Sequence, residues 1–536
     1  MPLLFSNRTH KLCTLPNGTW LLLISDPDDT LCACSVSVAA GAHNDPSSLP
    51  GLAHLTEHML LAGGSRQYPA PGTYHDTISR YEGRHNAYTT GEQTTFYFEL
   101  PLLRSACGDT TTFATVAAML ADSLHEPLFT TGALNKEIYS VAAEHDANAA
   151  TPGKLLYHGL RQLANPRHPF SRFSTGSLQT LGRSRRLKRR VQQYFQRHVS
   201  GGPRAVCLRG PQSIHALGAI ALAHFAAEPG AGGGGGAAAL ENVWLPQYSD
   251  TPCFLAHPPH NTVHIVSETR RVVRYVWPVD RAECPFSPRE VWLFAAMWAE
   301  LLGDECPGSL CDTLVERGWA TECLAYVSEF SVRDAGLVLE VSLSVEGWRA
   351  RGQVDECVAG FRCKGELAAC AEFLRTQDVA DLIAFVHRVK PGSPMDEASE
   401  LSARMLENLD VLGVHNLLRG QPTFADLGGY ADIASLPEDS PEAQRWWEAV
   451  ASRFMQFVEA SMCWAAVRVV RLGPRSASTE YAREEYYGYE CAFDTLPGGN
   501  VPFTLHFPPP NPFIPSWCSN PCLLYTSDAA DELDGV

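Results

Sequence analysis

The chain has a deficit of positive charge. Its 536 residues include 42 Lys and Arg against 59 Asp and Glu, which gives a net charge of -17. This balance argues against nucleic acid as a main partner, because phosphate binding needs clustered basic side chains, and equally against an anionic membrane surface. One basic run, residues 183–190 (RSRRLKRR), departs from this balance. Since it leads into an apolar helix face, we interpret it as a solvated helix start, not as a nucleic-acid or localisation patch.

Long apolar runs and paired cysteines are also missing. No run of about eighteen apolar residues is present, so no membrane-spanning helix is predicted. The N-terminal residues lack the charged segment and apolar core of a secretory signal peptide. The 17 cysteines are odd in number and irregularly spaced, without a C-x-x-C pair, and therefore indicate neither a disulfide framework nor a cysteine metal site. We expect a reducing compartment, the cytoplasm.

What is present is enough apolar sequence for two or three domains with real cores, since 45% of the residues are hydrophobic. Strand-like runs such as residues 21–25 and 336–344 alternate with helix-like runs such as 112–124 and 291–302. Residues 228–239 (EPGAGGGGGAAA) form the one stretch typical of a flexible linker. A domain boundary is predicted there.

The most specific motif is His54-Leu55-Thr56-Glu57-His58. On a helix, residues four apart share one face, so His54 and His58 can bind one metal ion while Glu57 stands beside it. The order H-x-x-E-H is called inverzincin and is typical of a zinc site with its own base. Apolar neighbours and a following Gly63-Gly64 favour a helix here.

A catalytic zinc ion needs a third protein ligand. Residues 134–150 carry Glu137 and Glu144 two helical turns apart, on one face. Either of them can be the ligand, and the other can then orient a zinc-bound histidine. His145 points in a different direction because neighbours on a helix diverge. Without the zinc motif, the same pair would equally fit a solvated acidic helix face.

Segments on both sides of the motif follow one known order. They are residues 15–18 (LPNG), 52–101, 165–173 (NPRHPFSRF), 307–310 (PGSL), 484–488 (EEYYG) and 513–515 (FIP). In this order they resemble the insulysin family of pitrilysin-type zinc metallopeptidases, over about residues 12–515. The resemblance implies an α+β fold of two homologous domains, each a mixed sheet covered by helices.

The resemblance also implies how the chain is divided. We expect a zinc-binding catalytic domain in residues 1–227 and a second domain without zinc in residues 240–515, with residues 228–239 as the linker. Residues 516–536 are predicted to be disordered or foreign, because residues 523–536 are polar, acidic and unlike the family.

Roles carried over by position complete the expected site. The resemblance assigns one zinc ion per chain to His54, His58 and Glu144, the base to Glu57 and a supporting acidic role to Glu137. Substrate binding by strand addition is assigned to Asn86, Ala87, Tyr88 and Thr89. The expected function is that of a zinc endopeptidase that hydrolyses extended peptides with zinc-activated water.

Family members have a further half that helps to stabilise the transition state, whereas this chain ends where the first half does. The chain is therefore expected to be the N-terminal half of such an enzyme, acting with a second half or as a homo-oligomer. Two alternatives remain open. One is a processing-peptidase-type subunit that needs a partner chain, and the other is a non-catalytic scaffold of the same fold.

Overall fold

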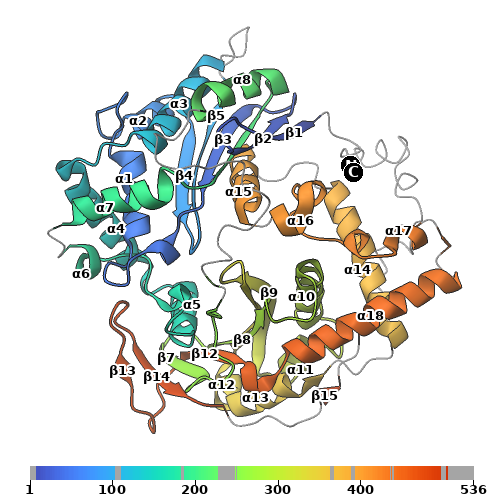
Figure 1. The fold of residues 1–536 in the computed structure, drawn as a ribbon. Coiled ribbons are helices and arrows are strands. Elements are labelled where there is room, and N and C mark those ends of the chain that lie inside the picture. Colours follow the sequence, from blue (N-terminus) through green and yellow to red (C-terminus); the bar gives the residue numbers. More distant parts are fainter. Residues whose placement is uncertain are drawn as a thin grey trace.

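Two β-sheets with helices against them stand at opposite ends of the molecule (Figure 1). The computed structural model describes residues 8–102, 110–182, 186–226, 248, 250–362, 367–387, 393–407, 409–434, 436–437, 440–496, 503–504 and 507. The predicted linker, residues 228–239, and the predicted tail, residues 516–536, lie outside the described residues. The α+β class with mixed sheets is confirmed.

The first sheet has six strands in the order β1-β2-β6-β3-β5-β4. β2 and β6 pair in parallel, and all other neighbours pair antiparallel. This order leaves β1 and β4 at the two edges. The strands are β1 (Thr9–Thr14), β2 (Trp20–Ser25), β3 (Leu31–Val38), β4 (Arg84–Thr89), β5 (Thr94–Pro101) and β6 (Arg204–Gly210).

The second sheet repeats this arrangement. Its order is β13-β14-β7-β12-β8-β10-β9, with a parallel pair at β7 and β12 and antiparallel pairs elsewhere. Apart from β13, each strand has a counterpart in the first sheet, so the edge strands β4 and β9 are equivalent. The strands are β7 (Thr262–Val266), β8 (Val272–Asp280), β9 (Ala320–Glu329), β10 (Asp334–Leu343), β12 (Arg468–Gly473), β13 (Ala482–Arg483) and β14 (Glu490–Asp494); β11 (Phe361–Arg362) pairs with β15 (Phe503–Thr504).

Both faces of the first sheet are buried. Alternate residues of a strand point to opposite faces, so neighbouring residues of β2 belong to different cores. Leu21 and Leu23 belong to the core beneath the helices of the first half, whereas Leu22 and Ile24 belong to a separate core on the other face. The helices of the first half are α1 (Leu52–Ala62), α2 (Thr73–Arg80), α3 (Thr110–His125), α4 (Thr131–Asn148), α6 (Leu178–Leu181), α7 (Leu187–Tyr194) and α8 (Ile214–Phe225).

The second sheet is likewise covered on both faces. A large core that includes Trp277 and Trp298 lies on one face, and a smaller one that includes Val276 and Val470 lies on the other. The helices of the second half are α10 (Pro288–Leu302), α11 (Leu310–Glu316), α12 (Val345–Arg349), α13 (Arg351–Gly360), α14 (Leu367–His387), α15 (Pro394–Glu407), α16 (Leu409–Asn416), α17 (Tyr430–Ile433) and α18 (Pro441–Ser461).

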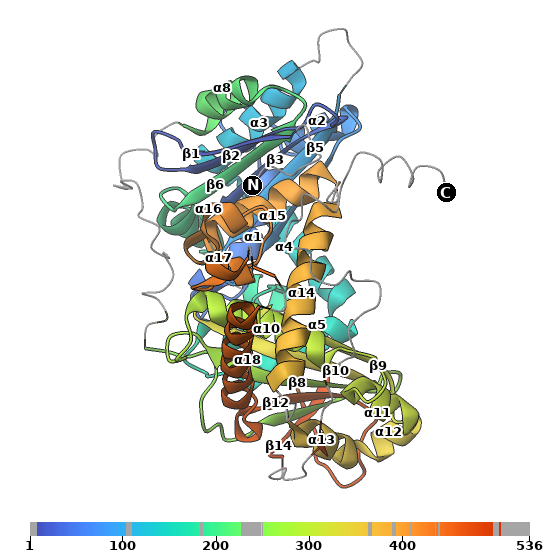
Figure 2. The same ribbon diagram turned by 90° about the vertical axis from the view of Figure 1, so that its right-hand side faces the viewer.

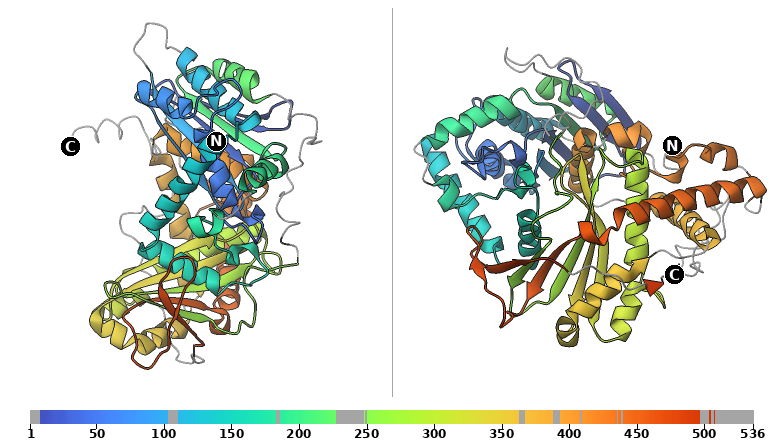
Figure 3. Two further views of the ribbon diagram at one scale, coloured as in Figure 1. Left: turned by 90° about the vertical axis from the view of Figure 1, so that its left-hand side faces the viewer. Right: turned by 60° about the horizontal axis from the view of Figure 1, so that its bottom comes forward.

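The two halves exchange one helix each. α5 (Pro152–Gln162) follows α4 in the chain but packs its leucines against β7 and β12 of the second sheet. α15 belongs to the second half but covers β3, β5 and β6 of the first sheet (Figure 2). From the side, the blue and yellow-green sheets remain at opposite ends (Figure 3, left). Packing therefore crosses the predicted boundary between residues 1–227 and 240–515.

Polar contacts also hold α15 on the first sheet. The Ser402 hydroxyl lies 2.7 Å from that of Ser35 and 2.8 Å from that of Ser37, all buried. Glu397 forms ion pairs with Arg8 and Arg209 beside them. Since unpaired buried polar groups are costly, these partners fix where the helix docks. Among the described residues, no helix is both long and apolar enough to span a membrane.

Truncating a buried leucine of α15 should destabilise the whole chain. Leu401 is 1% exposed against the first sheet, so Leu401→Ala is expected to lower the free energy of unfolding by about 2–5 kcal/mol. Leu222→Ala is the matched control, because Leu222 of α8 is 56% exposed. Denaturant unfolding measures both. Equal losses in the two variants would contradict the docking of α15.

Candidate metal centre

Two neighbouring helices of the first half carry the predicted ligands. α1 buries Leu52, Leu55 and Met59 in the core and holds His54, Glu57 and His58 on a polar side. α4 packs against α1 and carries Glu137 and Glu144. The helices predicted around both motifs are therefore present. His145 points elsewhere, as expected, since its Nε2 donates a hydrogen bond to the Tyr486 carbonyl at 3.1 Å.

Hydrogen bonds fix the orientation of both imidazoles. His54 Nδ1 donates to the Thr175 carbonyl at 2.7 Å, and His58 Nδ1 donates to Glu137 Oε2 at 3.2 Å. The two Nε2 atoms lie 3.4 and 3.5 Å from Glu144 Oε2. With a proton on each Nδ1, either ring in its neutral form would present its Nε2 lone pair to one point beside Glu144.

The donor set fits a zinc ion. Ligand atoms of His54, His58 and Glu144 all lie within 4.8 Å of one another, and this is the one group of three or more potential metal ligands within the described ranges. Two imidazoles and a carboxylate are ligands that zinc accepts in catalytic sites. Of the two glutamates that the sequence left open, Glu144 joins this group, while Glu137 orients His58.

Electrostatics couple these groups. Hydrogen bonds from His54 and His58 hold the pKa of Glu144 well below its usual range. Burial lowers the pKa of His58, but its hydrogen bonds with Glu137 and Glu144 outweigh burial and raise the pKa to about 9. The centre thus favours positive charge beside the Glu144 carboxylate, which is the condition that a divalent cation needs.

Glu57 stands beside this group in a different environment. Its side chain is buried, and burial raises its pKa above the ordinary value, although His54 opposes the shift. Glu57 Oε2 accepts a hydrogen bond from the Thr89 hydroxyl at 2.6 Å. Sequence reasoning assigned Thr89 only to the predicted substrate strand. Contact between its hydroxyl and Glu57 depends on the tertiary packing of α1 against β4.

The predicted substrate strand lies next to the centre. Asn86, Ala87, Tyr88 and Thr89 belong to β4, which pairs with β5 on one side and forms an edge of the sheet on the other. An edge strand offers unpaired backbone groups to an incoming extended peptide. All four residues also line a cavity of about 1020 Å³ that contains His54, Glu57, His58 and Glu144.

Both halves of the chain line this cavity. Glu329, Phe330, Ser331, Glu407 and Tyr487 reach it from the second half. The site is therefore not a property of residues 1–227 alone. Its lining combines His54, His58 and Glu144 with residues of β9, α15 and the loop before β14.

Comparison with known proteins agrees with this geometry. Residues 21–170 match the family model described as Insulinase (Peptidase family M16). AXL1 of Saccharomyces cerevisiae is 33% identical over an alignment 581 residues long, which covers 98% of this chain and 48% of that protein. The chain therefore contains a Peptidase M16 (insulinase) domain. The human insulin-degrading enzyme is 26% identical over 348 residues, 63% of the M16 chain and 32% of the enzyme.

Solved structures agree on the fold. Pitrilysin has a TM-score of 0.74 at 20% identity, over 96% of the M16 chain and 50% of pitrilysin. A peptidase M16 inactive domain from Pseudomonas fluorescens has a TM-score of 0.61 at 15% identity, over 88% of the chain and 99% of that domain. The chain spans about half the length of AXL1 and pitrilysin, and about a third of the human enzyme.

A close backbone approach supports His54 in this M16 site. Gly51, at the start of α1, has φ +90°, and an added Cβ would lie 2.2 Å from Gly176 Cα. Gly176 directly follows Thr175, whose carbonyl accepts the His54 hydrogen bond. The two glycines thus set the distance between the loop and the helix. Sequence reasoning assigned neither glycine a role at the site, although both are visible in the sequence.

The loop before β14 contacts α5 and Phe173 of the first half. Glu484 accepts hydrogen bonds from the backbone NH groups of Tyr486 and Tyr487, and it pairs with His158 of α5 at 3.0 Å. Tyr487 packs edge-on against Phe173. This segment, which carried part of the family resemblance, therefore connects the second half to α5 and Phe173.

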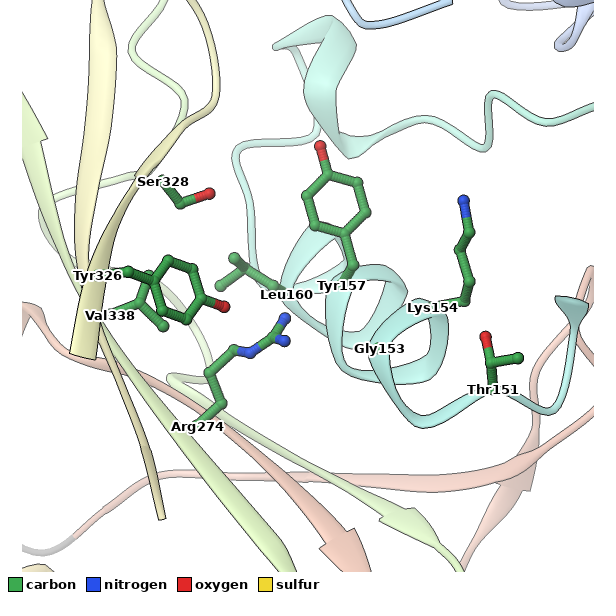
Figure 4. A pocket seen from close by; sticks show the side chains of 9 residues that line it. All are labelled: Thr151, Gly153, Lys154, Tyr157, Leu160, Arg274, Tyr326, Ser328 and Val338. Atoms are coloured by element: carbon green, nitrogen blue, oxygen red, sulfur yellow. The ribbon is translucent and has the colours of Figure 1, made fainter. Parts of the chain in front are cut away.

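A second cavity of about 470 Å³ adjoins the first, since Lys154 and Tyr157 of α5 line both. Figure 4 shows these two side chains extending from α5 and Arg274, Tyr326 and Ser328 facing them from the second sheet. Arg274 is neutralised by Glu340 at 2.7 Å, and Glu340 also accepts a hydrogen bond from the Tyr326 hydroxyl. The cavity extends the space beside the centre along α5.

Proposed function

We propose that the chain is a zinc-dependent endopeptidase that cleaves extended peptides, and that it forms the N-terminal half of an insulysin-like enzyme. The convergence of His54, His58 and Glu144 beside the buried Glu57, in a cavity flanked by an edge strand, carries the proposal. Membership of a peptidase family supports hydrolysis as the reaction.

One zinc ion per chain would be held by the Nε2 atoms of His54 and His58 and by the carboxylate of Glu144. A bound zinc ion supplies a Lewis acid for the scissile carbonyl and lowers the pKa of water toward about 7. Glu137 keeps the His58 ring in the ligating orientation, and the Thr175 carbonyl does the same for His54.

Glu57 is assigned the proton transfers. Because Oε2 accepts the Thr89 hydroxyl, the carboxylate is held in place and its other oxygen is left for the reaction. Glu57 takes a proton from the attacking water and passes it to the leaving amine, so no acyl-enzyme is needed. A buried carboxylate with a raised pKa is suited to both steps.

The substrate would add as a strand to the free edge of β4, along Asn86, Ala87, Tyr88 and Thr89. Main-chain hydrogen bonds of this kind hold an extended peptide with loose side-chain preference. Small unfolded polypeptides are therefore the proposed substrates, and the cytoplasm remains the predicted location.

Two other functions are weaker candidates. The inactive M16 domain of P. fluorescens has the same fold, so fold alone does not imply catalysis. A processing-peptidase-type subunit would need a partner chain for activity. His54, Glu57, His58 and Glu144 together favour a catalytic chain, because a scaffold needs none of them.

Zinc stoichiometry and peptide cleavage test the proposal together. The chain should bind one zinc ion and cleave an unstructured fluorogenic peptide at an internal bond, with a higher rate when the C-terminal half of a pitrilysin-type enzyme is added. Glu144→Gln should lose both zinc and cleavage, whereas Glu126→Gln, at an exposed site away from the ligands, should keep both. If the chain neither bound zinc nor cleaved the peptide, with or without the added half, the proposed function would be overturned.

A further inference from the structure

A pair of histidines outside the ligand group lines the same cavity. His75 lies on α2 and His85 on β4, two elements that contact each other in the first half (Figure 1). His75 Nδ1 and His85 Nε2 are 2.8 Å apart, and the rings meet edge to face with centroids 5.1 Å apart. Neither residue took part in the proposed catalytic steps.

The two nitrogens are close to the separation that a shared metal ion requires. Two nitrogens bound to one tetrahedral ion at about 2.0–2.1 Å lie about 3.3 Å apart. A shift of about half an ångström, together with a rotation of the exposed His75 ring that turns both lone pairs toward one ion, would reach that geometry. His75 is exposed and free to make such a shift, while the buried neighbours Tyr74 and Ile78 anchor its helix.

The protonation of His85 permits binding. Its Nδ1 is buried without a hydrogen-bond partner, so no contact fixes which of its ring nitrogens carries the proton. Burial, helped by His75, lowers the pKa of His85, which keeps a lone pair available at neutral pH. A metal ion that displaces the proton of the hydrogen bond between the rings would bind two neutral imidazoles.

We propose that His75 and His85 form a second binding site for a divalent transition-metal ion of the zinc, copper and nickel class, separate from the His54–His58–Glu144 group. Imidazole nitrogen suits these ions, in contrast to magnesium or calcium. His85 lies on β4 directly before Asn86, so an ion bound there sits beside the strand edge assigned to the substrate. Insofar as the proposed function holds, excess metal ion inhibits cleavage through this site.

Site-resolved modification tests the binding independently of catalysis. The chain, first saturated with one equivalent of zinc, is titrated with Ni²⁺ and then treated with diethylpyrocarbonate, and the modified histidines are identified by mass spectrometry. Ni²⁺ is expected to protect His75 and His85 together, while the exposed His215 of α8 stays reactive. Reactivity of both histidines unchanged by Ni²⁺ would show that the pair is only a hydrogen bond and would overturn the proposal.

Variants give the affinity. Losing a group that merely supports a metal ligand costs 10–100-fold in affinity, so His75→Asn or His85→Asn should weaken Ni²⁺ binding by at least about 100-fold, and His215→Asn should leave it unchanged. Circular dichroism identifies a variant that fails to fold, and the modification experiment on the unaltered chain then decides.

The same mass spectra report zinc protection of His54 and His58 separately. If zinc protects His54 and His58 but Ni²⁺ does not protect His75 and His85, only the second site is rejected. If Ni²⁺ protects His75 and His85 but zinc does not protect His54 and His58, only the proposed function is rejected.

Discussion

Replacing Glu57 with Gln is expected to lower kcat by about 10²- to 10⁴-fold, while zinc stays bound at one ion per chain. The amide has the same size as the carboxylate, and its oxygen can still accept the Thr89 hydroxyl, so the local packing is preserved. It cannot take up the proton of the attacking water. Steady-state peptide cleavage and zinc content, measured on the same preparation, check the result.

Glu137→Gln is the matched control for that experiment. Glu137 contacts His58 Nδ1 and belongs to no proton-transfer step, so its loss should weaken zinc binding by about 10- to 100-fold and leave cleavage recoverable with added zinc. Loss of zinc from Glu57→Gln would instead place Glu57 among the metal ligands. The assignment of Glu57 as the base would then be wrong.

Gly51→Ala is expected to be the most damaging single substitution near the centre. Gly51 has φ +90°, where an L side chain is strained by about 1–2 kcal/mol, and its Cβ would meet the Gly176 backbone at 2.2 Å. Backbone atoms cannot rotate away, so the free energy of unfolding should fall by more than about 3 kcal/mol. Zinc affinity should fall too, because the Thr175 carbonyl moves away from His54.

Gly72→Ala separates strain from collision. Gly72 begins α2 with φ +82°, nearly the same backbone conformation, but an added Cβ would meet nothing nearer than Asp76 Oδ2 at 3.9 Å. Its cost should stay at about 1–2 kcal/mol, with zinc affinity unchanged. Thermal unfolding and zinc titration compare the two variants. Equal losses would mean that the contact between Gly51 and Gly176 has no part in supporting His54.

Local periodicity was enough to align the candidate ligands within each helix. Four-residue spacing put His54 and His58 on one face, and seven-residue spacing aligned Glu137 with Glu144, because both depend only on the geometry of a single helix. The strand that contains Asn86 was expected from the family resemblance, and the structure has it as β4. Which glutamate faced both histidines could not be settled from spacing alone.

Contacts between distant segments could not be predicted in this way. The link from Thr175 to His54 and the link from Thr89 to Glu57 join separate elements whose relative position is set by packing. The apolar stripe of α15 predicts a helix, yet a stripe does not reveal which sheet it will cover. The exchange of α5 and α15 therefore emerged only from the structure.

That exchange has a consequence for synthesis on the ribosome. The sheet face that α15 covers is complete when β6 ends at Gly210, but α15 begins only at Pro394. At elongation rates of about 5–20 residues per second, the helix emerges roughly 10–40 s later. Throughout that delay the nascent chain displays Leu22, Ile24 and Cys207 without their native cover. Early release or slowed translation should thus favour aggregation, and chaperone binding is expected to concentrate on the first half.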